Sequence, residues 1–482
     1  MKVSVNERGM VSRISDSAMR ATYQAGNWMK LGLFGIRNGP VATLADLKKY
    51  PWMRNIFQSG KLLHTMTGTR TGPYAKANAI VISDIVTSIL DMIRDMKKNP
   101  DTLVLHEDLV PPEILYGMGL TPWMTEFLGL ALPLVNNTSM EPYIDAAEND
   151  GIPPDICSLV KSTIGLVLRN ELPKPRAIVS SNMPCDGGMS SYTLIEKQLG
   201  VPIFRLDIPF DFYNERAITY FVGELKRMIA WLEETTPGRM DWDRMREVCE
   251  ERNRFVELEV ELWDLVRQKP APMAGEPIYL SHLIYGICNP GRQRGTRMME
   301  RVIECAKELQ KKGAGAIPNE KYRVVLWNPP TVVFPDLFVW AEQAYGVSMV
   351  MDMLTYNRHP FIDTSSPDSM LRGMAQVIMQ GPMARHTRGP AENFFGDLFN
   401  LYEQFDLDMI WMAGHIGCKN TQALNGMLRE KCRERNIPLL IIDYDLSDTR
   451  VVSPDDIRRQ IEQFMETVMK AERLDGKGAG ND

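Results

Sequence analysis

Three of the seven cysteines stand where they could hold a metal. Cys185 and Cys418 each follow an apolar run that predicts a buried strand, and each precedes a helical pattern. Cys157 follows Pro153-Pro154-Asp155 at a predicted helix start, where the positive helix terminus favours a thiolate. Thiolates are strong metal ligands. No CxxC pair supports the site, so three unrelated loop thiols remain the alternative.

The other four cysteines have weaker claims to a ligand role. Cys249, Cys305 and Cys432 lie in helical patterns beside charged residues, where a cysteine usually packs as a small apolar group, and we exclude them. Cys288, in YGICNPG, is a predicted loop residue and stays a reserve candidate.

Four residues are candidate acids or bases: His106, Glu107, Glu113 and His415. His415 lies three residues before Cys418, close to the possible metal, and a histidine there could transfer a proton. The alternative for both histidines is a structural hydrogen bond. Glu113 could equally be a first-turn acid that the helix dipole favours.

A compact basic segment, GRQRGTR, carries Arg292, Arg294 and Arg297. We expect a loop whose guanidinium groups could bind phosphates through charge-assisted hydrogen bonds. A solvated surface loop is the alternative.

Parallel sheets are needed to bring these side chains together. Apolar runs at 177–180 and 203–208 flank the SNMPCDGG loop and a helical pattern, which predicts a strand–helix–strand unit. A second alternation of strands and helices runs from 323 to 442. Ligands of such sheets gather beyond the carboxyl ends of the strands. We therefore expect an α/β fold with two Rossmann-like domains.

Five segments are expected along the chain. They are an N-terminal helical extension (1–99), a first Rossmann-like domain (100–215), a helical connector (216–275), a second Rossmann-like domain (276–473) and a disordered tail (474–482).

Composition excludes some classes of function. The net charge of -6 gives no global positive field, so nonspecific nucleic-acid binding is not expected. The longest strongly apolar stretch, 127–135, is far shorter than the roughly 20 residues that a membrane helix needs. The first ten residues lack the pattern of a secretory signal, so we expect a cytoplasmic protein without a membrane span.

Five segments in this order resemble the large iron–sulfur component of the 2-hydroxyacyl-CoA dehydratase and benzoyl-CoA reductase family. They are PPEILYGMGLTP, AAENDGIPPDICSLVKSTIG, MPCDGG with LGVPIFRLDIPF, VVLWNPPTVVFPDLF, and HIGCKN with NIPLLIIDYDLSDTR and IRRQIEQFMETV. The resemblance covers about residues 102–468 and leaves the N-terminal extension unexplained.

The resemblance implies a [4Fe-4S] cluster on Cys157, Cys185 and Cys418, whose fourth iron would be open to a substrate oxygen. It also implies an oxygen-sensitive, anaerobic (R)-2-hydroxyacyl-CoA dehydratase, which reduces the thioester by one electron to a ketyl radical and expels the 2-hydroxyl. An ATP-dependent benzoyl-CoA (aryl-CoA) reductase is one alternative, and a non-catalytic electron-transfer or scaffold subunit is another.

Partners and further site residues follow from the same resemblance. Expected partners are a homologous second subunit in a heterodimer, an ATP-hydrolysing iron–sulfur activator and the acyl-CoA substrate. The sequence has no GxxxxGK[ST] phosphate loop, so ATP would be consumed by the activator. His415, Glu113 and His106 are then catalytic candidates, and Arg292, Arg294 and Arg297 are candidate contacts for the phosphates of CoA.

Overall fold

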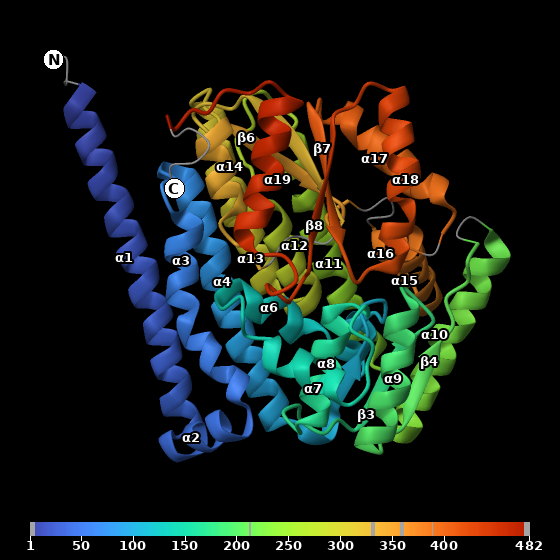
Figure 1. The fold of residues 1–482 in the computed structure, drawn as a ribbon. Helices are drawn as coiled ribbons and strands as arrows, with labels where there is room; N and C mark the ends of the chain where they lie inside the picture. Colours follow the sequence, from blue (N-terminus) through green and yellow to red (C-terminus); the bar gives the residue numbers. More distant parts are fainter. Residues whose placement is uncertain (1–4, 212–213, 329–332, 357–360, 388, 477–482) are drawn as a thin grey trace.

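Two parallel four-stranded sheets organise the chain (Figure 1). The first contains β1 (Leu103–His106), β2 (Thr121–Met124), β3 (Ala177–Ser181) and β4 (Ile203–Leu206). The second contains β5 (Tyr322–Trp327), β6 (Val347–Asp352), β7 (Met409–His415) and β8 (Leu439–Tyr444). The strand orders, β2-β1-β3-β4 and β6-β5-β7-β8, follow the same plan. The expected α/β fold with two parallel sheets is confirmed.

The computed structural model describes residues 5–211, 214–328, 333–356, 361–387 and 389–476, with side chains from residue 14 onward. Every residue of β3, β6 and β7 is buried, as expected for strands covered by helices on both faces. The apolar runs of these strands are the sequence pattern that predicted them.

Helices cover both sheets. Those of the first half are α5 (Pro112–Gly117), α6 (Phe127–Val135), α7 (Glu141–Asn149), α8 (Ser158–Leu168) and α9 (Asp186–Leu199). Those between the sheets in the chain are α10 (Glu215–Thr235), α11 (Trp242–Val266), α12 (Glu276–Cys288) and α13 (Gln293–Lys311). Those of the second half are α14 (Leu337–Tyr345), α15 (Pro367–Gln380), α16 (Pro382–Arg385), α17 (Ala391–Gln404), α18 (Lys419–Glu434) and α19 (Pro454–Thr467).

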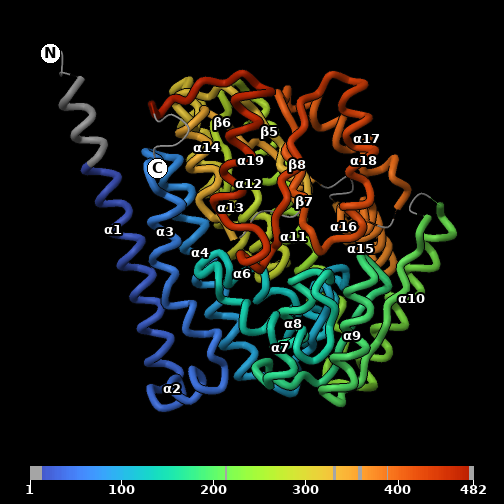
Figure 2. The backbone as a smooth tube through the Cα atoms, viewed as in Figure 1, coloured from blue at the N-terminus to red at the C-terminus, as the bar shows by residue number. Residues whose placement is uncertain are grey.

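The N-terminal segment is helical over its described length. It consists of α1 (Val5–Asn38), α2 (Pro40–Lys49), η1 (Pro51–Gln58), α3 (Ser59–Thr67), α4 (Gly72–Lys98) and η2 (Pro100–Thr102). Figures 1 and 2 show α1 along one side of the molecule, next to α3 and α4. Buried side chains of α4 belong to the same hydrophobic core as those of both sheets, so this segment packs as part of the body.

Two expectations about loops are wrong. Cys288 is the last residue of α12 and is buried, so it is no loop cysteine. GRQRGTR is not a loop either, because α13 begins at Gln293 and carries Arg294 and Arg297 in its first turns. Its Gly295 packs so tightly that a Cβ would lie 2.4 Å from the Tyr285 ring, which explains a glycine inside this helix.

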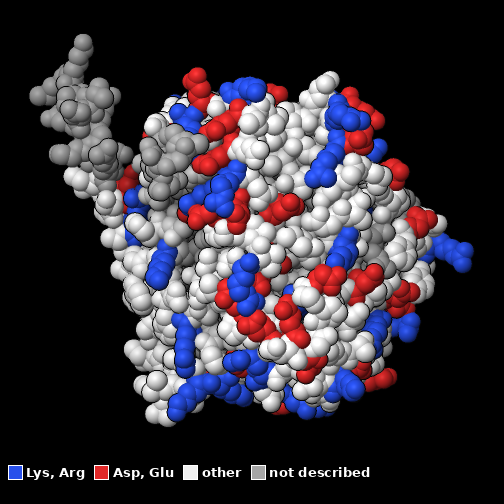
Figure 3. Space-filling model, in the orientation of Figure 1, with Lys and Arg blue, Asp and Glu red and all other residues white. Residues whose placement is uncertain are grey.

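The structure describes residues 474–476 of the predicted tail. Leu474 donates its backbone N–H to the Ala344 carbonyl at 2.8 Å, while 477–482 lie outside the described residues. Within the part of the chain that the structure covers, no helix is long and apolar enough to cross a membrane. Figure 3 shows basic and acidic side chains interspersed over one face.

Candidate functional site

Cys157, Cys185 and Cys418 share one structural position, because each is the N-cap residue of a helix: α8, α9 and α18 respectively. Cys185 follows β3 and Cys418 follows β7, which are the third strands of the two sheets. Equivalent βα turns of the two halves therefore supply two of the thiols. The third comes from a helix start that follows no strand directly.

Direct contacts join the three cysteine segments. His415 Nε2, at the end of β7, lies 3.1 Å from Cys157 Sγ. Asn420 Nδ2 donates to the Pro184 carbonyl at 2.8 Å, and this links the Cys418 segment to the Cys185 segment. A Cβ on Gly417 would lie 2.6 Å from the Cys157 Cα, so the glycine permits this close backbone approach.

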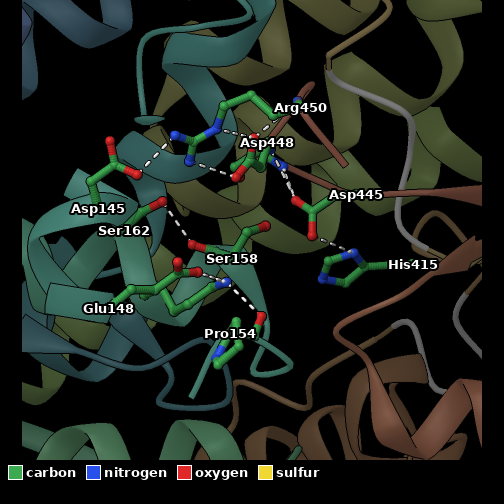
Figure 4. A network of polar contacts seen from close by, with 11 residues as sticks. Asp145, Glu148, Pro154, Ser158, Ser162, His415, Asp445, Asp448 and Arg450 are labelled. Carbon is green, nitrogen blue, oxygen red and sulfur yellow. Dashed lines mark hydrogen bonds and ion pairs between the residues drawn. The ribbon is translucent and has the colours of Figure 1, made fainter. Parts of the chain in front are cut away.

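A polar network fixes the start of α8 (Figure 4). Lys161 Nζ donates to the Pro154 carbonyl at 2.7 Å and to Glu148 Oε1 at 2.6 Å, which holds the loop before Cys157. On the other side of the network, Asp445 Oδ2 lies 3.8 Å from His415 Nδ1. Both ends of the contact between Cys157 and His415 are thus held in place.

The three cysteines line one cavity of about 610 Å³. The cavity lies at the carboxyl ends of both sheets, since residues at or just after five strands line it. These are His106, Met124, Leu354, His415 and Leu446. Much of the remaining wall is apolar, with side chains such as Leu109, Phe255 and Met374. Among the described lining residues, the cysteines are these three, while Cys249, Cys305 and Cys432 are buried in helices elsewhere.

Burial favours the protonated form of two of these thiols, Cys157 and Cys185. It raises the pKa of Cys157, and the neighbouring thiols of Cys418 and Cys185 raise that pKa further. Burial also raises the pKa of Cys185 to about 11, although the Gly188 N–H that its sulfur accepts opposes the shift. The thiolate expected for Cys157 at a helix start is therefore not favoured in the metal-free protein. A metal would have to displace these protons.

Carboxyl groups in the same cavity have raised pKa values. Burial raises the pKa of Glu126 to about 7, and the hydroxyls of Thr125 and Tyr192 that donate to its carboxylate oppose the shift. Desolvation in the cavity raises the pKa of Asp108 to about 6. Burial raises the pKa of Glu107 well above its usual value, and the nearby carboxyl groups of Asp108 and Glu126 raise it further. Such groups can hold protons near neutral pH and release them to a reacting molecule.

The predicted acids and bases all line this cavity. Burial lowers the pKa of His106 to about 4, so its ring is neutral at neutral pH. Its Nδ1 lies 3.0 Å from the Glu107 carbonyl, which can only accept, so Nδ1 carries the ring proton. Glu113 lies 3.8 Å from Arg252, and burial nevertheless raises its pKa.

Sequence reasoning missed several groups of the cavity: Asp108, Glu126, Arg252, Glu259 and His282. His282 Nδ1 lies 2.5 Å from Glu259 Oε1. Burial favours the neutral ring, but the Glu259 carboxylate raises the pKa of His282 above its ordinary value. Glu126 follows β2, a short strand that was not predicted, and Arg252 lies inside the long helix α11, so neither had a local signal.

The three predicted phosphate contacts lie apart from the cysteines. Arg292 stacks over the Tyr116 ring at 4.5 Å and lies 3.6 Å from Asp95. Arg294 pairs with Asp91, and both Arg294 and Arg297 line a second, smaller cavity. None of the three arginines is among the described residues that line the cysteine cavity.

The three thiols are not arranged around a single metal ion. Among the described residues, no three histidine, cysteine, aspartate or glutamate side chains converge closely enough to hold one metal ion. Cluster cysteines bind different iron atoms, so they need not converge on one point. Three thiols around one largely apolar cavity match a cluster with one iron left without a cysteine.

Comparison with known proteins bears on the family of the chain. The family model described as 2-hydroxyglutaryl-CoA dehydratase, D-component, matches residues 109–468. The alpha subunit of (R)-2-hydroxyglutaryl-CoA dehydratase from Acidaminococcus fermentans is 25% identical over 172 residues, which are 35% of this chain and 36% of that relative. The match thus spans about a third of that relative's length.

Two further relatives match over longer stretches. The alpha subunit of lactoyl-CoA dehydratase from Anaerotignum propionicum is 20% identical over 396 residues, which are 77% of this chain and 92% of the relative. One subunit of benzoyl-CoA reductase from Thauera aromatica is 21% identical over 350 residues, with 67% and 78% covered. Because the family model extends from the loop after β1 to just past α19, the chain belongs to the 2-hydroxyglutaryl-CoA dehydratase D-component family, whose relatives include 2-hydroxyacyl-CoA dehydratase and benzoyl-CoA reductase subunits.

Proposed function

We propose that the chain is the [4Fe-4S] subunit of an oxygen-sensitive (R)-2-hydroxyacyl-CoA dehydratase, with Cys157, Cys185 and Cys418 as the cluster ligands. The observation that carries the proposal is the convergence of three helix N-caps, all cysteines, on one cavity at the carboxyl ends of both sheets. The dehydratase alpha subunits among the relatives support the reaction type.

A cluster held by Cys157, Cys185 and Cys418 would supply the one-electron reduction of the thioester to a ketyl radical. The chain's own residues then have to exclude water and handle protons. Apolar side chains such as Phe255 and Met374 line the cavity wall. Loss of the 2-hydroxyl needs a proton, and Glu126, with its raised pKa, can hold one near neutral pH. His415, His106 and Glu113 remain the proposed catalytic residues from the sequence, with Glu126 added from the structure.

Iron and acid-labile sulfide per chain test the proposal in anaerobically purified protein. We expect about four of each in the wild type, and a clear loss in Cys157→Ala, Cys185→Ala and Cys418→Ala. Cys432→Ala is the matched control, because Cys432 is buried in α18 away from the cavity. Iron-free wild-type protein, or loss of iron in the control alone, would contradict the proposal.

A second candidate is ATP-dependent reduction of an aryl-CoA ring, which the match to the benzoyl-CoA reductase of Thauera aromatica favours. Product analysis with the purified complex separates the two reactions. An enoyl-CoA supports dehydration, and a dienoyl-CoA ring product supports reduction. If the chain only transfers electrons or acts as a scaffold, variants of His415 and Glu113 that keep the cluster would turn over at the wild-type rate.

The proposed assembly contains a homologous second subunit and an ATP-hydrolysing iron–sulfur activator. The relatives are themselves named as subunits, which supports a partner chain. Such a partner chain could bind to an apolar surface on α1 and α2, whose side chains Met29, Ile36, Val41 and Leu44 are each more than 60% exposed. Binding of CoA phosphates by Arg292, Arg294 and Arg297 and a cytoplasmic location stay predictions.

A further inference from the structure

A second cavity, of about 220 Å³, lies between α1, α4 and α13. Its lining residues are Lys30, Ile80, Ser83, Asp84, Thr87, Arg294, Arg297, Met298 and Arg301. None of these lines the cysteine cavity. Lys30 and the four residues from α4 precede residue 109, where the family match begins, so one wall of this cavity is built by a part of the chain that the family model does not cover.

Positive charge dominates this lining. Four of the nine side chains are cationic, and Asp84 is the one carboxyl group among the described lining residues. Arg294 has an acidic partner, Asp91, which does not itself line the cavity.

The other three cations donate to neutral oxygens. Lys30 Nζ bonds to the Ser83 carbonyl at 2.9 Å and to the Ser83 hydroxyl at 2.6 Å. Arg297 Nη1 donates to Gln293 Oε1 at 3.3 Å, and Arg301 Nη2 donates to the Tyr23 hydroxyl at 2.5 Å. Of the four cations, Arg294 is therefore the one with an ion pair among the described residues.

The pKa shifts of the two partly buried members, Lys30 and Asp84, agree with this excess of positive charge. Burial lowers the pKa of Lys30; Asp84 opposes the shift, while Arg294 and Arg301 add to it. Burial also raises the pKa of Asp84 to about 6, which weakens its hold on the surrounding cations in mildly acidic solution. An anion placed between Lys30 and the arginines would relieve their mutual repulsion.

We propose that this cavity binds a phosphate-bearing anion, with Lys30, Arg294, Arg297 and Arg301 as donors. Guanidinium groups match phosphate oxygens in pairs of parallel hydrogen bonds, and a lysine adds a compact point charge. A water molecule takes about 30 Å³ in the liquid, so the cavity has space for a phosphate group with water. The bound anion would clamp the N-terminal segment to α13. This inference does not depend on the cluster or on the reaction.

Two sources could provide this chemistry: the phosphates of a CoA molecule, or a free phosphate compound. Calorimetric titration of the full chain with inorganic pyrophosphate, at ionic strength fixed with sodium chloride, tests the site itself. We expect saturable binding that weakens by roughly tenfold in Arg297→Gln and in Arg301→Gln, because each loses charge-assisted hydrogen bonds. Arg429→Gln is the matched control, since Arg429 is an exposed helical arginine outside the cavity.

A variant that is expected to gain affinity for pyrophosphate gives a sharper test. Asp84→Asn removes the cavity's carboxylate while nearly preserving its shape, so pyrophosphate should bind more tightly than to the wild type. Binding that does not saturate, or equal affinity in Arg297→Gln, Arg301→Gln, Asp84→Asn and the control, would overturn the proposal. Competition then identifies the source: coenzyme A that displaces pyrophosphate assigns the site to CoA, and coenzyme A that leaves pyrophosphate bound assigns it to a free anion.

Discussion

His415 donates a hydrogen bond to Cys157, a residue 258 positions away in the chain. The backbone N–H of Leu446 points at His415 Nδ1 at 3.2 Å, so Nδ1 accepts and the ring proton lies on Nε2. Nε2 lies 3.1 Å from Cys157 Sγ. Burial lowers the pKa of His415, which keeps this neutral tautomer in place near neutral pH. The histidine is thus suited to stabilise a thiolate at Cys157.

Replacing His415 should slow the alkylation of the Cys157 thiol. In metal-free protein, we expect His415→Phe to reduce the rate at which iodoacetamide alkylates Cys157 by roughly tenfold, because a hydrogen bond to a charged group contributes about 1.5–3 kcal/mol. Mass spectrometry after timed labelling measures the rate at each cysteine. Cys185, which accepts from Gly188 instead, is the internal control. Equal slowing at Cys185 would point to a collapse of the cavity rather than to a lost donor.

Gly417 should be intolerant of even one methyl group. A Cβ there would lie 2.6 Å from the Cys157 Cα and 2.9 Å from the Cys157 nitrogen, and backbone cannot move aside as a side chain can. We expect Gly417→Ala to separate the Cys157 and Cys418 segments, to cost about 1–3 kcal/mol, and to lower the iron content.

Gly426→Ala is the control for this change. Gly426 lies in α18, the helix that Cys418 caps, and a Cβ there would meet nothing within 4 Å. Its iron content and urea midpoint should match or slightly exceed those of the wild type, since alanine favours a helix. Similar iron content in both variants would show that the close approach at Gly417 does not set the spacing of the cysteines.

Glu126 should make the protein less stable as pH rises. Its pKa is about 7 in the folded chain and near 4.5 when exposed, so the folded state binds more protons between these values. This contribution is fully present below pH 4.5 and is lost as pH rises through about 7. At about 1.4 kcal/mol for each pKa unit, the loss is on the order of 3 kcal/mol.

The variant Glu126→Gln isolates this effect, because it stays neutral and can still accept from Tyr192. Urea unfolding at pH 5 and pH 8 should show a smaller loss of stability in the variant than in the wild type. A pH dependence that is unchanged in Glu126→Gln would mean that the carboxyl group is ionised in both states or solvated in the fold.

Local patterns were enough to predict much of this molecule. The buried strands were recognisable from apolar runs such as 177–180, and the loop positions of Cys185 and Cys418 follow from them. β2 was missed because TPWM is short, contains a proline and gives no alternating pattern. The turns of α13 were missed because Gly291 and Gly295 suggest a loop, whereas Gly295 serves close packing against Tyr285.

Contacts between residues far apart in the chain could not be predicted from the spacing of residues in the sequence. Nothing in the sequence places His415 against Cys157, or brings the cations of α1 and α13 around one cavity, because these contacts depend on how the helices pack. The raised pKa values of Asp108 and Glu126 could not be predicted either, since they come from desolvation in the cavity, which no local pattern encodes.

Arg70 should be the most costly residue to remove from the N-terminal segment. It lies between α3 and α4 and is buried, with Nη1 2.5 Å from Glu276 and Nη2 2.5 Å from Glu342. Tyr74 also donates to Glu342 at 2.7 Å. In Arg70→Met both carboxyl groups lose their cation inside the protein, which typically costs about 3–5 kcal/mol. The urea midpoint should therefore fall strongly.

A surface ion pair gives the contrast for this prediction. Arg372 lies 2.6 Å from Glu215, but the two side chains are 40% and 75% exposed, so Arg372→Met should cost no more than about 1 kcal/mol. The deficit of Arg70→Met should also shrink at pH 5, because burial raises the pKa of Glu276 to about 7, and its protonation removes one of the uncompensated charges. The prediction is contradicted if the two variants lose equal stability, or if the stability lost in Arg70→Met is the same at both pH values. Either result would mean that water or another cation compensates these carboxylates, and that apolar contacts alone hold the N-terminal segment to α12 and α14.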